Sequence, residues 1–178
     1  LDQVLSIFEL IPDIDLNVMK KDQDLFDVTS SILIKMRNVL SDESPDLVIV
    51  HGDTTTAMAT SLASFYLKIP VAHVEAGLRT HDIYSPFPEE INRNIITTIS
   101  NIHFAPTETA KQNLLREGVS KDAIYVTGNT VIDALLSVVE NSKELDFSSK
   151  LLSKIPFLDK KNSESCRIIL FTGHRREN

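Results

Sequence analysis

The sequence has little that would crosslink it or anchor it in a bilayer. Its 178 residues include one cysteine, Cys166, and no tryptophan. A single cysteine excludes an internal disulfide, so we expect a reducing, cytoplasmic compartment and a packing role for Cys166. No apolar run reaches the roughly 20 residues that a membrane span requires. We therefore expect a globular protein without a membrane partner.

Positive charge and the common cofactor motifs are also lacking. The formal net charge is −7, which argues against a broad surface for nucleic acid. It still leaves room for a small anionic ligand held by a few local donors. There is no G-x-G-x-x-G and no P-loop, and no cluster of His, Cys and carboxylates has the spacing of a zinc site. We expect no metal and no redox cofactor.

The chain alternates short apolar runs with amphipathic stretches. Such runs predict strands, and the β-branched residues 46–50 are typical of a strand that is covered on both faces. The alternation predicts right-handed βαβ units, hence an α/β fold with a doubly wound parallel sheet of the Rossmann-like kind. The predicted strands are 46–50, 71–74, 102–105, 124–126 and 167–171, with 16–19 as a weaker candidate, and the predicted helices are 25–40, 54–67, 89–100, 107–117 and 130–139.

The domain organisation follows from a change in composition. Residues 140–164 are rich in Ser, Lys and Asp and have only short apolar islands. We predict a Rossmann-like domain over 1–140, a connector over 141–165, and the first strand and loop of a second domain over 166–178. Because the chain starts without Met and ends in an apparent loop, we interpret it as a fragment.

Polar residues follow several of the predicted strands. Asp53 comes after the first strong strand, Glu75 after the next, and His174 after the last. Each has a structural explanation: Asp53 and the Glu89–Glu90 pair suit helix N-termini, Glu75 could pair with Arg79, and Arg175 could be solvated. The histidines within strands, His73 and His103, are expected to be core residues.

Convergence favours a functional interpretation. In an open parallel sheet, ligands bind beyond the carboxyl ends of the strands, and these loops meet at that edge. Carboxylates gathered in one cleft can supply both a base and an acid. A histidine and arginines complement a diphosphate.

Six ordered segments resemble signatures of one enzyme family, the non-hydrolysing UDP-N-acetylglucosamine 2-epimerases. The resemblance extends over essentially the whole chain and is loosest between residues 140 and 164. The segments are 51–56 (HGDTTT), 74–80 (VEAGLRT), 84–93 (YSPFPEEINR), 104–109 (FAPTET), 126–135 (VTGNTVIDAL) and 172–178 (TGHRREN).

The resemblance implies a fold like that of the GT-B glycosyltransferases, with a UDP-sugar held between two Rossmann-like domains. It implies interconversion of UDP-GlcNAc and UDP-ManNAc without cofactor or metal, by elimination of UDP to 2-acetamidoglucal and re-addition. The product would feed surface polysaccharide synthesis, and the intact protein would be a homodimer.

By position, the resemblance implies roles for particular residues. Asp53, Glu75 and Glu89 match the catalytic carboxylates, and His174 matches a catalytic histidine that contacts UDP. Asp53 and Glu75 would also contact the substrate. Arg79, Arg93 and Arg175 are weaker candidates for ligand contact or for orienting the carboxylates. Which carboxylate is the base stays open.

Other functions remain open at this point. A hydrolysing relative would release ManNAc and UDP by the same elimination, and an inert UDP-sugar-binding module would bind without exchange at C2. A glycosyltransferase would need an acceptor and would leave C2 untouched. The resemblance also implies that a first strand with a Gly-Thr-Arg-Pro-Glu loop precedes Leu1 and that most of a second domain follows Asn178. We therefore expect the 178 residues alone to be inactive and poorly folded.

Overall fold

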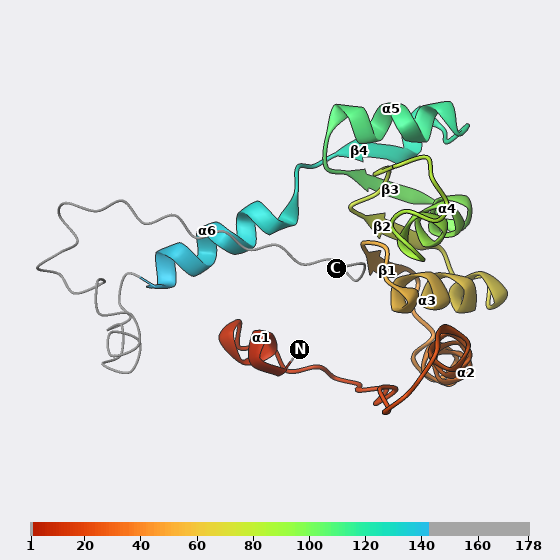
Figure 1. Ribbon diagram of the computed structural model, residues 1–178, viewed down its shortest axis with the longest axis vertical. Helices are drawn as coiled ribbons and strands as arrows, with labels where there is room; N and C mark the ends of the chain where they lie inside the picture. The colour runs from red at the N-terminus through yellow and green to blue at the C-terminus, as the bar shows by residue number, and fades with distance from the viewer. Residues whose placement is uncertain (1, 143–178) are drawn as a thin grey trace, which may run out of the picture. The chain divides into compact units, whose positions relative to one another are not determined.

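The computed structural model describes residues 2–142, and within them it has a four-stranded parallel sheet flanked by helices (Figure 1). This confirms the predicted α/β class. The strand order is β1-β2-β3-β4. In chain order the elements are α1 (Asp2–Ile7), α2 (Leu25–Glu43), β1 (Val48–His51), α3 (Thr55–Tyr66), β2 (Val71–Val74), α4 (Glu89–Ile99), β3 (Ile102–Ala105), α5 (Glu108–Arg116), the 3-10 helix η1 (Lys121–Ala123), β4 (Ile124–Val126) and α6 (Thr130–Ser142).

Apart from the weak strand at 16–19, the predicted helices and strands within the described residues agree with these elements to within a few residues. Helix α2 begins after Asp24, whose side chain accepts from Asp27 N–H in a capping box. Neither α1 nor η1 was predicted. The sheet belongs to a compact unit, Leu1–Ile132. The predicted strand 167–171 and residues 143–178 of the predicted domains lie outside the described residues, and the domain boundaries stay predictions.

The predicted weak strand at residues 16–19 is wrong. Asn17 has a positive φ of 44°, and its N–H donates to the side chain of Asp15. The carbonyl oxygens of Leu16 and Asn17 accept from Lys35 Nζ at 2.6 and 3.3 Å. Because a side chain satisfies these backbone groups, they need no neighbouring strand.

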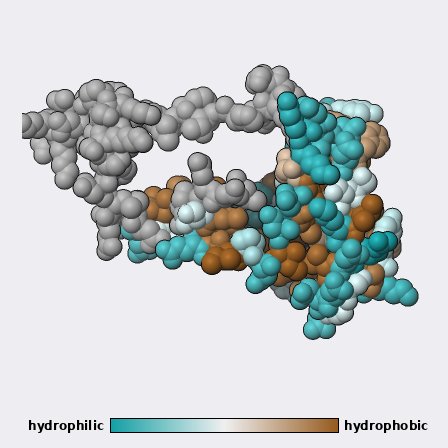
Figure 2. Space-filling view, turned by 90° about the horizontal axis from the view of Figure 1, so that it is seen from below, coloured by the Kyte–Doolittle hydropathy of each residue, from teal (hydrophilic) through white to brown (hydrophobic). Residues whose placement is uncertain are grey.

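One face of the sheet carries the core. The register places Val50, His73, His103 and Ile124 side by side, so these residues share a face. Val50 and Val71 pack with Ala57 of α3 and Ile96 of α4. On the other face, Ile49 is 64% exposed and Tyr125 is 52% exposed. Hydrophobic residues also reach the surface elsewhere, as the view from below shows (Figure 2). The described helices α3, α4 and α5 therefore bury one face more fully than the other.

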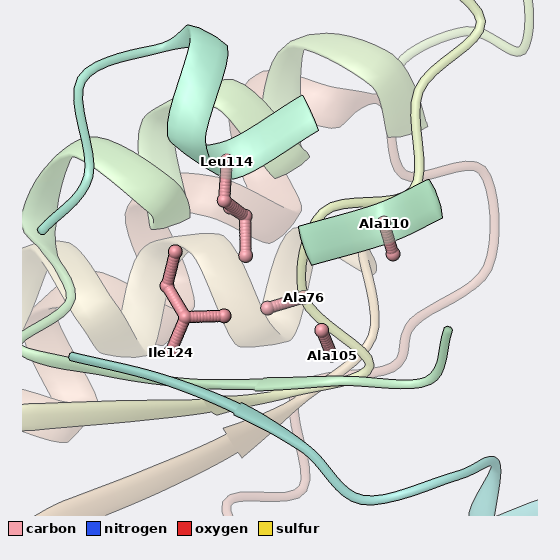
Figure 3. Packing of buried hydrophobic residues seen from close by; sticks show 5 residues of the cluster. All are labelled: Ala76, Ala105, Ala110, Leu114 and Ile124. Atoms are coloured by element: carbon pink, nitrogen blue, oxygen red, sulfur yellow. The ribbon is translucent and has the colours of Figure 1, made fainter. Parts of the chain in front are cut away.

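Small residues bring α5 close to the sheet. Ala76, Ala105 and Ala110 are buried together with Leu114 and Ile124, and Figure 3 shows Leu114 of α5 directed toward Ile124 and the alanines. A Cβ on Gly77 would lie 2.3 Å from the Ala110 carbonyl oxygen, and its φ is +86°. Only glycine fits this close approach. The turn after β2, which carries Glu75, is thus fixed against α5.

We predict that Gly77→Ala in the full-length protein lowers the free energy of unfolding by roughly 2–5 kcal/mol, because it combines left-handed strain of about 1–2 kcal/mol with overpacking of about 1–3 kcal/mol. The matched control is Gly118→Ala. Gly118 has nearly the same backbone conformation, φ +87°, but a Cβ added there would meet no atom within 4 Å, so only the strain applies. Urea unfolding measures both variants, and equal losses would contradict the close-approach argument.

Candidate active site

Three polar residues lie at the carboxyl ends of β1 and β2: the predicted Asp53 and Glu75, and His51. His51 ends β1 and pairs in register with Val74, the last residue of β2. Gly52 N–H donates to the Val74 carbonyl at 3.0 Å. The next residues are therefore Asp53 on one loop and Glu75 on the other. His51 Nε2 lies 3.5 Å from Glu75 Oε2. The predicted convergence of Asp53 and Glu75 on this edge agrees with the backbone geometry.

Asp53 is bound by an arginine and does not cap a helix. Thr54 is the N-cap of α3, and its hydroxyl accepts from Ala57 N–H at 3.2 Å. The Asp53 carboxylate is therefore left for Arg93, whose Nε donates to Asp53 Oδ2 at 2.9 Å and whose Nη2 lies 2.8 Å from the same oxygen. Arg93, a candidate for ligand contact or for orienting the carboxylates, thus contacts one of these carboxylates. Asn92 Nδ2 also donates to the Asp53 carbonyl at 2.9 Å.

Glu90 completes this network and was not recognised from the sequence. Its side chain is 1% exposed, and its Oε2 accepts from Arg93 Nη1 at 2.8 Å. Its Oε1 accepts from the backbone N–H groups of Thr80 and His81 at 3.1 and 3.0 Å. Burial alone would raise the pKa of Glu90, but the N–H groups of His81 and Thr80 and the guanidinium of Arg93 outweigh it and hold the pKa below its ordinary value. Glu90 is therefore ionised at neutral pH.

Glu75 has an unusual backbone conformation, with a φ of +68°. A non-glycine residue in this region costs of order 1–3 kcal/mol and persists only where its surroundings fix it. Those surroundings are present: Ala76 N–H donates to the Phe104 carbonyl at 3.0 Å, and Asn113 Nδ2 donates to the Gly77 carbonyl at 3.0 Å. Such strain tends to occur at functional positions, which supports a role for Glu75.

Glu89 lies in the first turn of α4, as its position after Pro88 predicts. It is partly buried. In the described part of the chain, no hydrogen bond or ion pair involves its carboxylate. Of the three predicted carboxylates, Asp53 is thus bound to arginine, Glu75 faces a histidine, and Glu89 has no protein partner within residues 2–142.

Arg79 does not join this cluster, and its ion-pair partner is Glu117, so the structural explanation in which Arg79 pairs with Glu75 does not hold. Its guanidinium forms two hydrogen bonds of 2.7 Å to Glu117. It also donates to the Leu78 carbonyl and to Thr97 Oγ1. The Arg79 side chain is 1% exposed. A contact between Arg79 and a ligand stays a prediction, and it would require some of these bonds to break.

Two buried histidines lie side by side on the covered face of the sheet, as the core interpretation predicts. His73 and His103 pair in register. His73 Nε2 lies 2.8 Å from the Gly52 carbonyl, so Nε2 carries the proton. Among the described residues, both Nδ1 atoms lack a hydrogen-bond partner. Burial lowers the pKa of His73 from 6.5 to about 4 and also lowers the pKa of His103. Neutral His73 thus holds the loop between His51 and Asp53.

Away from this edge, a polar hollow of about 560 Å³ lies near the ends of α4 and α5. Its lining includes Thr97, His103 and Glu117. It is beside the Arg79–Glu117 pair and toward the amino ends of β3 and β4. Ligands of open parallel sheets bind at the opposite edge, so no ligand is assigned to this hollow. No group of three metal-ligating side chains is found within residues 2–142, and none of the helices described there has the length and hydropathy of a membrane span.

We predict that neutral His73 makes the stability of the full-length protein depend on pH. Its folded pKa is about 4, below the unfolded value of 6.5, so its contribution is present above pH 6.5 and is lost as the pH falls toward 4. The loss approaches roughly 3 kcal/mol. His73→Gln keeps a donor for the Gly52 carbonyl but does not titrate. Urea unfolding at pH 7 and pH 5 should therefore show a smaller decrease for His73→Gln than for wild type. Equal decreases would contradict the assignment.

Comparison with known proteins identifies the family. The family profile described as UDP-N-acetylglucosamine 2-epimerase matches residues 1–178. The UDP-N-acetylglucosamine 2-epimerase of Campylobacter jejuni is 54% identical over 179 residues, which cover 100% of this chain and 46% of that protein. The enzyme of Escherichia coli K12 is 53% identical over 99% of this chain and 46% of its own length.

Solved structures agree. The crystal structure of UDP-GlcNAc 2-epimerase from Neisseria meningitidis bound to UDP-GlcNAc matches with a TM-score of 0.89 and 51% identity, over 99% of this chain and 47% of that one. The epimerase of Methanocaldococcus jannaschii in complex with UDP-GlcNAc and UDP matches with a TM-score of 0.78 and 41% identity, over 85% and 41%. The chain spans about half the length of the relatives it matches. It belongs to the UDP-N-acetylglucosamine 2-epimerase family.

Proposed function

We propose that the full-length protein interconverts UDP-GlcNAc and UDP-ManNAc in the cytoplasm, as a homodimer that supplies surface polysaccharide synthesis. The observation that carries the proposal is that Asp53 and Glu75 directly follow the carboxyl ends of the adjacent parallel strands β1 and β2, with Asp53 bound to Arg93 and Glu75 beside His51. Family membership supports it, as does the Neisseria meningitidis relative, whose structure contains UDP-GlcNAc.

The proposed chemistry needs a base and an acid at C2 of the sugar. One carboxylate removes the C2 proton while the bond between C1 and the UDP oxygen breaks, giving 2-acetamidoglucal and UDP. UDP then adds back to C1, and a carboxylic acid delivers a proton to the opposite face of C2. Asp53, Glu75 and Glu89 share these proton transfers. General acid–base catalysis of this kind contributes about 10²–10⁴-fold.

The leaving UDP needs groups that bind a diphosphate. We assign this role to His174 and Arg175, which match the family motif and lie outside the described residues. Arginine binds phosphate oxygens in a bidentate manner. The assignment rests on sequence resemblance alone, whereas the placement of the carboxylates rests also on the fold.

The test of the function is proton NMR of UDP-GlcNAc in D₂O with the full-length protein. We expect the C2 hydrogen to exchange for deuterium and UDP-ManNAc to appear without free sugar. Free ManNAc with UDP would instead indicate a hydrolysing enzyme, and an unchanged C2 signal in the presence of bound nucleotide would indicate a binding module.

We predict that Asp53→Asn, Glu75→Gln and Glu89→Gln each lower kcat by about 10²–10⁴-fold, because an amide can neither accept nor deliver the C2 proton. Steady-state epimerisation assays measure this. Glu108→Gln is the control, since Glu108 is an exposed acid in the first turn of α5, and it should leave kcat unchanged. A carboxylate whose amide variant retains near-normal turnover has no part in the proton transfers.

A further inference from the structure

Glu90 is buried at a position where acids are usually exposed. Acids are favoured in the first turn of a helix by the helix dipole, and an exposed side chain suffices for that effect. Glu108 in the first turn of α5 shows this arrangement: its side chain is 68% exposed, and its only ion pair among the described residues is a 3.7 Å contact with Lys111. Glu90 is 1% exposed. Burying a carboxylate is costly unless it is paired and hydrogen-bonded, so its partners require an explanation beyond the dipole.

The partners of Glu90 belong to both loops of the site. Its Oε1 accepts from the N–H groups of Thr80 and His81, in the segment that follows β2. Its Oε2 accepts from Arg93 Nη1. Through its other nitrogens, Arg93 binds Asp53 in the loop that follows β1. A single buried carboxylate therefore connects the loop after β2 to the side chain of Asp53.

The orientation of Arg93 depends on its contacts with two carboxylates. Its side chain is 12% exposed, and Asp53 and Glu90 are its ion-pair partners among the described residues. A guanidinium fork fixed from one side by a buried carboxylate presents its remaining nitrogens in a defined direction. Without Glu90, Arg93 keeps its attraction to Asp53 but loses the contact that sets its angle.

We propose that Glu90 is a positioning residue, which orients the Asp53 carboxylate through Arg93 and holds the loop after β2 at a fixed distance from it. The inference rests on the proposed function, because turnover is the quantity that the orientation of Asp53 affects. Glu90 does not itself touch the reacting atoms. A small displacement of a reacting group costs on the order of 10²-fold in rate.

The first test is a double-mutant cycle in the full-length protein. Glu90→Gln can still accept from Thr80 and His81 but cannot form the ion pair with Arg93. We expect it to lower kcat by about 10–100-fold with KM changed by less than about threefold. In the Asp53→Asn background, Glu90→Gln should lower kcat by less than about threefold further, because it acts through Asp53. The matched control, Glu108→Gln, breaks an i,i+3 pair with the same spacing and should have no effect in either background.

Two results would overturn the proposal. One is wild-type kcat in Glu90→Gln, and the other is an equal fold-loss in both backgrounds, which would show that Glu90 acts independently of Asp53. If Glu90→Gln does not fold, Arg93→Lys replaces it, since one ammonium cannot contact both carboxylates in the same geometry. It should show the same loss and the same lack of additivity.

The second test does not depend on activity. In a crystal structure of full-length Glu90→Gln, we expect Arg93 to have left its position 2.9 Å from Asp53 Oδ2. An unchanged Arg93–Asp53 contact would contradict the proposal even if the enzyme assay supported it. Absence of C2 exchange in the wild-type protein would instead contradict the proposed function, so the two failures can be told apart.

Discussion

The guanidinium of Arg93 lies between carboxylates from two parts of the chain, Asp53 after β1 and Glu90 in α4. It is nearly buried, so its charge is screened weakly and its hydrogen bonds are stronger than on the surface. The loop after β1 and the loop after β2 both depend on this arrangement, because Glu90 also binds Thr80 and His81. The strands β1 and β2 thus position the backbone of both loops, and Glu90 in the first turn of α4 connects these loops to each other.

The core fixes the other half of the site. Alanines at positions 76, 105 and 110 let α5 approach the sheet closely, and Gly77 removes the last steric barrier. Asn113 of α5 then holds the Gly77 carbonyl. This support allows Glu75 to keep its left-handed conformation. Packing of small residues and placement of a candidate catalytic carboxylate are therefore the same structural feature.

Hydrophobic periodicity, which is a local property of the chain, predicted most of the helices and strands. The rule that ligands bind beyond the carboxyl ends of parallel strands indicated the edge at which the candidate site is proposed. It did not predict pairings between distant residues. Arg79 binds Glu117, 38 residues away, and not Glu75, which is four residues away. The sequence explained Glu90 only by the helix dipole. Its burial depends on contacts with Thr80, His81 and Arg93, which sequence patterns do not reveal. The wrong prediction of a strand at 16–19 has the same cause, a contact between distant residues, because Lys35 donates to the Leu16 carbonyl. The roles of His174 and Arg175 remain predictions.

A crystal structure of the full-length protein with UDP-GlcNAc bound tests the central claim most directly, namely that the carboxylates at the ends of β1 and β2 act at C2 of the sugar. The account predicts that C2 lies within about 4 Å of a carboxylate oxygen of Asp53, Glu75 or Glu89. A sugar bound elsewhere, such as in the polar hollow beside Glu117, with C2 out of reach of all three carboxylates, would contradict it.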